Sequence, residues 1–274
     1  REETDGRLQL RMYPSGQLGR EGDAINLARF GALDLVRVYT GALNNAFPLT
    51  LPLGLPYLFE SVAHLRRALD GAVGERVLQG FEARGLVGLA IYDSGARCIY
   101  NTRGPIRSPE DLVGLKLRVP PSDAFMALLR ALRANPTPLA YGDVFSALET
   151  GLVDGAENNI RSFHASRHFE RARYWSRTQH SYAPDVLLMS KPMFDALSPV
   201  DQERLHRHAR ESVTVMRGLW DASEAQAQSA LVEAGVALND VDRDAFRAVL
   251  SPLVQRWTED PALRAVVELI REAA

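Results

Sequence analysis

The chain has 274 residues, 46% of them hydrophobic, which is enough for two ordinary lobes that each bury a core. Its formal net charge of −2 gives no reason to expect nucleic acid or an anionic membrane surface as a partner. Its one cysteine, Cys98, excludes both a disulfide within the chain and a cysteine cluster for a metal.

The first third of the chain alternates between segments typical of strands and of helices. Strands are expected over 7–13, 32–39 and 86–92, from alternating or short apolar runs. A helix is expected over 21–30, and Ser61 is placed to cap one long helix that Gly85 ends. Strands that alternate with helices predict an α/β fold with a substantially parallel sheet.

The alternation continues and then gives way to one long helical segment. Further strands are expected over 97–101, 115–119 and 153–157, and helices over 122–134 and 143–149. Ser198 and Pro199 open a helix that meets no internal proline before Gly235. At 1.5 Å per residue it would reach about 50 Å, which exceeds one small lobe. We therefore expect this helix to lie along both lobes, which ordinary strands connect.

Residues that could support catalysis do not form a set. His164 and His168 have the i, i+4 spacing of two metal ligands, but no HExxH motif supplies a third ligand and a base. Surface or hydrogen-bonded histidines are the better interpretation. No nucleophile elbow, phosphate loop or dinucleotide fingerprint occurs, and Cys98 lies in an expected strand as a small buried side chain. We predict no catalysis, no metal and no cofactor.

Four polar residues at strands are better suited to binding. Arg97 and Arg118 lie on short apolar strands, and a guanidinium can hold a carboxylate with two parallel hydrogen bonds. The alternative is that these arginines are lobe-surface charges paired with nearby acids. Asn158 and Asn159 follow an apolar strand, where open α/β sheets bind ligands. The alternative there is that both asparagines cap the next helix.

Five motifs then occur in a characteristic order. They are YPSGQLG at 13–19, GALD at 31–34, LPYLF at 55–59, GPIRSPEDLVGLKLRVP at 104–120 and PTPLAYGDVFSALETGLVDGAEN at 136–158. In this order they resemble the DctP-type solute-binding proteins of tripartite ATP-independent periplasmic (TRAP) transporters. The resemblance extends over nearly the whole chain.

The resemblance implies a two-lobed periplasmic-binding-protein fold, type II-like, with a long helix along both lobes. Lobe I would comprise residues 1–94 plus 184–235, and lobe II residues 95–183 plus 236–274. It implies a periplasmic, monomeric protein that closes over a small carboxylate and docks on the membrane subunits of a TRAP transporter. The family's first strand and helix would precede Gly6, so we expect N-terminal material, including an export signal, to lie outside this sequence.

The resemblance also assigns roles to individual residues. Arg118, in the KLRVP strand, would receive the substrate carboxylate, and Arg97 would add a contact. Asn158 is the asparagine of the DGAEN motif, and Tyr141 would line the pocket. Tyr39 stands where some sialic-acid binders have an acidic residue, which argues against sialic acid.

The surroundings of Asn158 are similar to those in the branch of the family that binds sugar acids. The similarity rests on Asn159, Ser162-Phe163, His168-Phe169, His180, residues 184–188, Arg37 and Asn44-Asn45. It implies a hexuronate such as glucuronate or galacturonate, with Asn159, His180 and Tyr39 as further ligand contacts. A C4-dicarboxylate, a keto acid or another carboxylate remains an alternative. A ligand-sensing module of a regulator and an enzyme on the same scaffold are alternatives from other classes.

Overall fold

Two β-sheets organise the chain in the computed structural model, which describes residues 2–14 and 16–274. The first sheet has the strand order β1-β8-β2, and the second has the order β5-β4-β6-β3-β7-β9. The first comprises β1 (Leu35–Tyr39), β2 (Leu86–Tyr92) and β8 (Asp185–Ser190). The second comprises β3 (Arg97–Asn101), β4 (Lys116–Val119), β5 (Asn135–Pro138), β6 (Gly155–Asn159), β7 (Tyr174–Ser181) and β9 (Ala237–Asn239).

The expectation of a substantially parallel sheet is wrong for the first sheet. Helices connect β1 to β2, but β8 lies between these strands and pairs antiparallel with both. This strand arrives from the second sheet through residues 182–184, so its insertion is a long-range event that local alternation does not reveal. In the second sheet β4 pairs parallel with β5 and β6, whereas β3 pairs antiparallel with β6 and β7.

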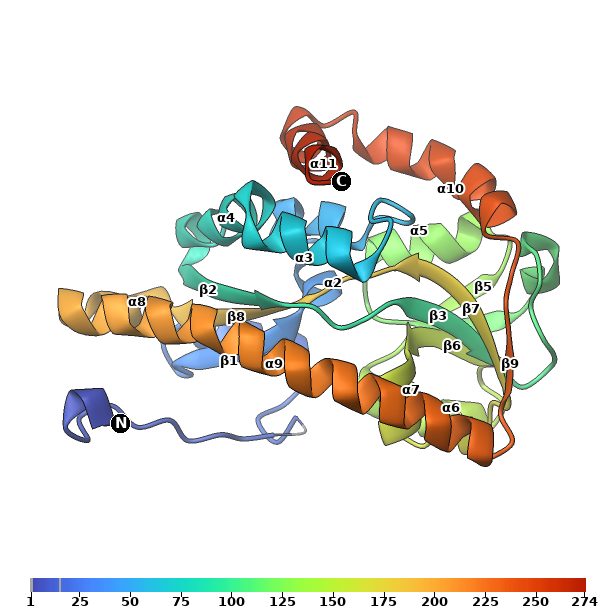
Figure 1. Ribbon diagram of the computed structural model, residues 1–274, viewed down its shortest axis with the longest axis horizontal. Helices are drawn as coiled ribbons and strands as arrows, with labels where there is room; N and C mark the ends of the chain where they lie inside the picture. Colours follow the sequence, from blue (N-terminus) through green and yellow to red (C-terminus); the bar gives the residue numbers. More distant parts are fainter. Residues whose placement is uncertain (1, 15) are drawn as a thin grey trace.

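Helices pack around both sheets (Figure 1). The α-helices other than α9 are α1 (Glu21–Arg29), α2 (Thr40–Leu43), α3 (Val62–Asp70), α4 (Ala72–Gln79), α5 (Asp123–Ala131), α6 (Val144–Glu149), α7 (Ile160–Ala165), α8 (Lys191–Asp195), α10 (Arg243–Trp257) and α11 (Pro261–Glu272). Short 3₁₀ helices are η1 (Glu2–Thr4), η2 (Pro48–Gly54), η3 (Glu82–Arg84), η4 (Pro109–Leu112), η5 (Tyr141–Asp143) and η6 (His168–Glu170). No helix in the described part of the chain is long and apolar enough to cross a membrane.

The long helix expected after Ser61 is two helices. Ser61 caps α3 as predicted, because its side chain accepts a hydrogen bond from the backbone N–H of His64. Gly71 then adopts an extended conformation and separates α3 from α4. The second helix approaches α3 so closely that a Cβ on Gly74 would lie 1.9 Å from the carbonyl oxygen of Leu69. The break allows both helices to place apolar faces on the same core.

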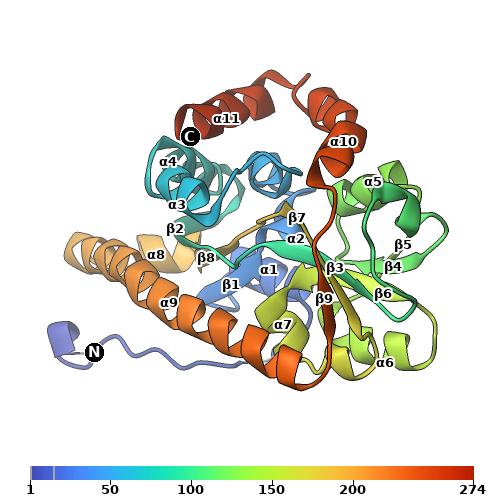
Figure 2. The ribbon, with the colours of Figure 1, turned by 45° about the vertical axis from the view of Figure 1, so that its right-hand side comes forward.

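The longest helix, α9 (Pro199–Glu233), has 35 residues and begins at Ser198, whose side chain accepts from the N–H of Asp201. Its first half packs on the first sheet, where Ala209 joins a cluster with Val87. Near its end, Leu231 is buried in a cluster of the second lobe. Figures 1 and 2 both show the helix extending along the two sheets. The prediction of a helix lying along both lobes is confirmed.

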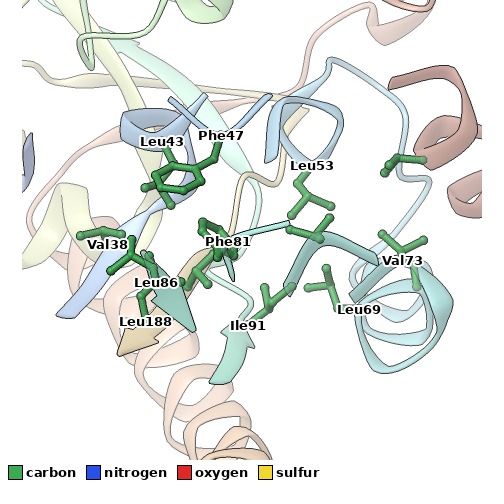
Figure 3. Close-up of a cluster of buried hydrophobic side chains, with 14 of the residues drawn as sticks. Val38, Leu43, Phe47, Leu53, Leu69, Val73, Phe81, Leu86, Ile91 and Leu188 are labelled. Atoms are coloured by element: carbon green, nitrogen blue, oxygen red, sulfur yellow. The ribbon is translucent and has the colours of Figure 1, made fainter. Parts of the chain in front are cut away.

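The core of the first lobe lies between the first sheet and the helices α3 and α4. Figure 3 shows aromatic side chains Phe47 and Phe81 among aliphatic side chains from β1, β2 and β8. The two rings are 4.8 Å apart between centroids. Burying each such side chain contributes about 1.5–3 kcal/mol, so this core fixes the sheet from which Tyr39 and Asp185 extend.

The strand expected over residues 7–13 is not formed. Leu10 is 78% exposed and Met12 is 82% exposed, and the described residues provide no strand that pairs with this segment. The alternation of apolar and polar side chains is therefore present, but the segment lacks the inter-strand hydrogen bonds that would make it a strand. The segment is tied to α9 by Arg7, whose Nη1 lies 2.8 Å from Oδ2 of Asp201.

The lobe boundaries stay a prediction, and the C-terminal helices contact both lobes. Phe246 of α10 is buried with Phe125 of α5, in the second lobe. Val266 and Ile270 of α11 belong instead to the core of the first lobe. Figure 1 shows α11 beside α3 and α4. Residues 236–274 were expected to belong to lobe II, but α11 packs on lobe I.

Candidate functional site

Arg97 and Glu157 form a buried ion pair near the junction of the two sheets. Arg97 lies in β3 and Glu157 in β6, and the pleat directs both side chains to the same face. The guanidinium Nη2 lies 2.8 Å from Oε1 of Glu157, and Nε contacts Oε2. Burial alone would raise the pKa of Glu157, but Arg97 and His180 hold it below its usual value. Arg97 therefore pairs with a nearby acid, but as a buried residue and not as a lobe-surface charge, and its contact with a ligand stays a prediction.

Arg118 is in a different position. It is 3% exposed in β4, and its Nε donates to the backbone oxygen of Leu139 at 2.9 Å. No carboxylate among residues 2–14 and 16–274 lies within ion-pair distance of its guanidinium. Burial lowers the pKa of Arg118, yet an arginine stays protonated at any working pH. A buried cation without a carboxylate is costly, so an anion supplied from outside would stabilise it.

The two asparagines lie on opposite faces of β6. Asn159 caps α7, because its side chain accepts from the N–H of Ser162 at 2.7 Å, and its contact with a ligand stays a prediction. Asn158 accepts from the N–H of Asn159 through Oδ1. Register pairs Arg118 with Ala156, two residues before Asn158, so Arg118 and Asn158 share one face. The Nδ2 amino group of Asn158 has no hydrogen-bond acceptor within the described chain.

The remaining predicted contacts differ in exposure. Tyr39 ends β1, its ring lies 4.8 Å from the Arg97 guanidinium carbon, and its buried hydroxyl has no partner among the described residues. Tyr141 is 43% exposed and its hydroxyl contacts the carbonyl oxygen of Ser162. His180 is fully buried, with Nε2 3.5 Å from Oε2 of Glu157.

Two acidic residues belong to the same surroundings. Glu21 was not singled out from the sequence, and Asp185 was named only as part of residues 184–188. Glu21, the first residue of α1, accepts from the N–H of Tyr39 through Oε1 at 3.2 Å. Asp185, the first residue of β8, lies opposite Tyr39 in the register and forms an ion pair with Arg37 at 2.6 Å. An acid at a helix start is explained by the helix dipole, so sequence alone gave Glu21 no other role.

The histidine pair is not a metal site. The Nδ1 atom of His168 lies 2.8 Å from the hydroxyl of Tyr100, and burial lowers the pKa of His168 to about 4. His164 stacks on Phe169. The part of the chain that the structure describes has no group of three potential metal ligands. Cys98 is buried in β3, and burial raises the pKa of its thiol to about 12, which suits a packing role.

Among the described residues, Arg118 is thus a buried cation with no carboxylate within ion-pair distance. A family model described as bacterial extracellular solute-binding protein, family 7, matches residues 1–260. The chain belongs to this family.

Solved structures of TRAP periplasmic solute-binding proteins are similar to the chain over its whole length. A TRAP solute-binding protein from Xanthobacter autotrophicus with bound β-D-galacturonate is 42% identical, with a TM-score of 0.97, covering 100% of this chain and 91% of the other. One from a Bradyrhizobium species with bound galacturonate is 44% identical, with a TM-score of 0.97, covering 99% and 91%. The 2,3-diketo-L-gulonate-binding periplasmic protein of Escherichia coli is 33% identical, covering 93% and 78%.

Proposed function

We propose that the protein is the periplasmic substrate-binding subunit of a TRAP transporter and that its substrate is a hexuronate, galacturonate or glucuronate. The observation that carries the proposal is Arg118, a buried guanidinium that has no carboxylate partner in the described chain. A ligand carboxylate would take that place. The galacturonate bound to two family members of 42% and 44% identity supports the choice of sugar acid.

The neighbours of Arg118 suit the rest of such a ligand. Asn158 offers an amide on the same face of the second sheet. The rings of Tyr39 and Phe125 lie beside the Arg97 guanidinium, with centroid distances of 4.8 Å and 5.3 Å. These contacts and the ion pair with Glu157 hold Arg97 rigidly, so its remaining donor atoms are pre-organised for ligand oxygens.

Binding would close the two lobes around the ligand. Two short connections between the sheets are residues 93–96 and 182–184, and Ser94 donates to the carbonyl oxygen of Ala183 at 3.0 Å. Cross-lobe contacts already present are Arg20 with Asp143 at 3.8 Å and Asn44 with Ser122 at 3.3 Å. A ligand that touches both lobes adds to these contacts only in the closed state, and so favours it.

Calorimetry on the purified protein tests the proposal. Galacturonate and glucuronate are expected to bind, whereas malate, which carries two carboxylates on a short chain, is not. Binding of malate or another C4-dicarboxylate in place of both uronates would refute the hexuronate assignment. The assignment of the chain to its family would not be affected. Recovery of the ligand unchanged after long incubation is expected, and turnover would refute a purely binding role.

One further candidate ligand has support. The Escherichia coli relative is named for 2,3-diketo-L-gulonate, an open-chain sugar acid with a single carboxylate. Arg118 would receive its carboxylate in the same way. The two ligands would then be distinguished by the groups that contact the rest of each molecule, such as those near Tyr39. A titration with each acid under the same conditions decides between them, and we expect tighter binding of galacturonate.

A further inference from the structure

Three charged side chains converge on Tyr39, where β1 ends and α2 begins. Glu21 accepts from the backbone N–H of Tyr39 at 3.2 Å. Asp185 lies directly opposite Tyr39 on the neighbouring strand β8. The guanidinium of Arg97 covers the Tyr39 ring at 4.8 Å. Two carboxylates from the first lobe thus lie next to the arginine of the second lobe, at the junction where the ligand is proposed to bind.

Each of these carboxylates has one oxygen engaged and one oxygen available. Glu21 uses Oε1 for the Tyr39 N–H, and Asp185 uses Oδ2 for Arg37. In the described chain, Oε2 of Glu21 and Oδ1 of Asp185 have no hydrogen-bond donor. An ionised carboxylate only accepts hydrogen bonds, so these oxygens suit hydroxyl groups and repel a second carboxylate.

The arginines around Tyr39 leave a single buried cation for a ligand. Glu157 neutralises Arg97, and Asp185 neutralises Arg37. Arg161 is exposed and stacks on the ring of Trp220. In the part of the chain described, Arg118 alone is a buried arginine with no carboxylate within ion-pair distance. The site can therefore match one ligand carboxylate, and a second would meet Glu21 and Asp185 without a free cation.

We propose that Glu21 and Asp185 set the specificity of the site: they accept hydroxyl groups of a sugar acid with one carboxylate and exclude acids that carry a second carboxylate at the other end. This inference rests on the proposed function. It identifies the substrate class as sugar acids with one negative charge and excludes sugar diacids of the same length.

The electrostatics of the two residues agree with this role. Glu21 is accessible to water but surrounded by protein atoms. Desolvation raises its pKa most, and Asp185 adds to the increase, whereas the N–H of Tyr39 and the charges of Arg118 and Arg97 oppose it. Desolvation likewise raises the pKa of Asp185, against the ion pair with Arg37. Negative charge is therefore already unfavourable in these surroundings, and a second ligand carboxylate would add to the repulsion.

A pair of open-chain acids isolates the effect of the second charge. Galactonate and galactarate have the same carbon skeleton and hydroxyl pattern, and differ in a terminal CH₂OH or carboxylate. Calorimetry would give Kd for both acids and for galacturonate, with the parent protein and with Glu21→Gln, Asp185→Asn and the double variant. Glu233→Gln, an exposed position at the end of α9, removes the same charge far from the site and serves as the control.

In the parent protein galactarate is expected to bind on the order of tenfold or more weaker than galactonate, because like charges without a counter-ion are penalised. Glu21→Gln and Asp185→Asn should each reduce this ratio, and the double variant should reduce it furthest. The control should leave it unchanged. Since Asp185→Asn strips Arg37 of its partner and could destabilise the fold, melting temperatures accompany the titrations, and Glu21→Gln alone suffices for the test.

Two results would overturn the inference. One is equal binding of the two acids by the parent protein, and the other is a ratio that Glu21→Gln and the double variant leave unchanged. Either result, together with tight binding of galacturonate, would refute the specificity role of Glu21 and Asp185 and leave the proposed function intact. If the parent protein binds none of the three acids but binds an unrelated carboxylate, both the proposed function and the inference fall.

Discussion

Arg97 of β3 donates two hydrogen bonds to the carboxylate of Glu157 in β6, and both side chains are buried. Arg118, on β4 next to β6, has no such carboxylate within the described residues. Two arginines that look alike in the sequence therefore differ in their charge partners. Arg97 is held rigid by an internal anion, and Arg118 is available to an anion from outside.

Replacing Arg118 with alanine is expected to abolish tight binding. The ligand carboxylate would be left buried without a partner, at a cost of about 2–5 kcal/mol. Arg118→Lys should recover only part of the affinity, because an ammonium group cannot form the planar two-point contact. Calorimetry with galacturonate measures both, and Arg130→Ala, an exposed position on α5, is the control. Unchanged affinity in Arg118→Ala would remove the main support for the proposed site.

Replacing Glu157 with glutamine is expected to lower the free energy of unfolding even in the absence of ligand. Arg97 would remain charged and buried without its counter-ion, a change that costs about 3–5 kcal/mol. Urea unfolding without ligand measures the loss. Glu149→Gln, which breaks the exposed ion pair with Arg171, should cost at most about 1 kcal/mol. Similar losses in the two variants would contradict the assigned burial of the Arg97–Glu157 pair.

His168 is expected to make the protein less stable in mild acid. Desolvation, aided by Arg118, lowers its pKa from about 6.5 to about 4 in the folded protein. The unfolded chain therefore binds more protons between these values, and stability falls as pH decreases from 6.5 to 4, by roughly 3 kcal/mol in total. Urea unfolding at several pH values in this range gives the free energy of unfolding, which should fall less steeply with decreasing pH in His168→Gln than in the parent. An identical slope in parent and variant would contradict a neutral, buried His168.

Gly95 is expected to be sensitive to substitution because it lies in the connection from β2 to β3. Its φ is +69°, and a Cβ there would lie 3.0 Å from a carboxylate oxygen of Glu224. Gly95→Ala should cost about 1–2 kcal/mol from the backbone conformation alone. Gly104→Ala is the matched control, since no heavy atom lies within 4 Å of the position that its methyl group would take and its φ is ordinary. Thermal unfolding compares the two, and equal melting temperatures would exclude strain at Gly95.

Local features of the sequence predicted most of the elements. The strands at 86–92 and 97–101 were placed correctly, as was the start of α9 at Ser198 and Pro199. These succeed because apolar periodicity and helix caps depend on residues a few positions apart. The strand predicted over residues 7–13 is wrong for a related reason. Apolar side chains that alternate with polar ones form a strand only when a neighbouring strand supplies hydrogen bonds.

The sequence by itself determined that the chain forms α/β elements around Arg97, Arg118 and Asn158, and its motif order determined the family. Only the tertiary structure decided that β8 enters between β1 and β2, which brings Asp185 opposite Tyr39. It also decided that Glu157 forms an ion pair with Arg97, whereas no carboxylate of the described residues lies within ion-pair distance of Arg118. Whether a charge is free depends on strand register and on which side chains meet across long sequence distances. Neither is encoded in the local spacing of residues.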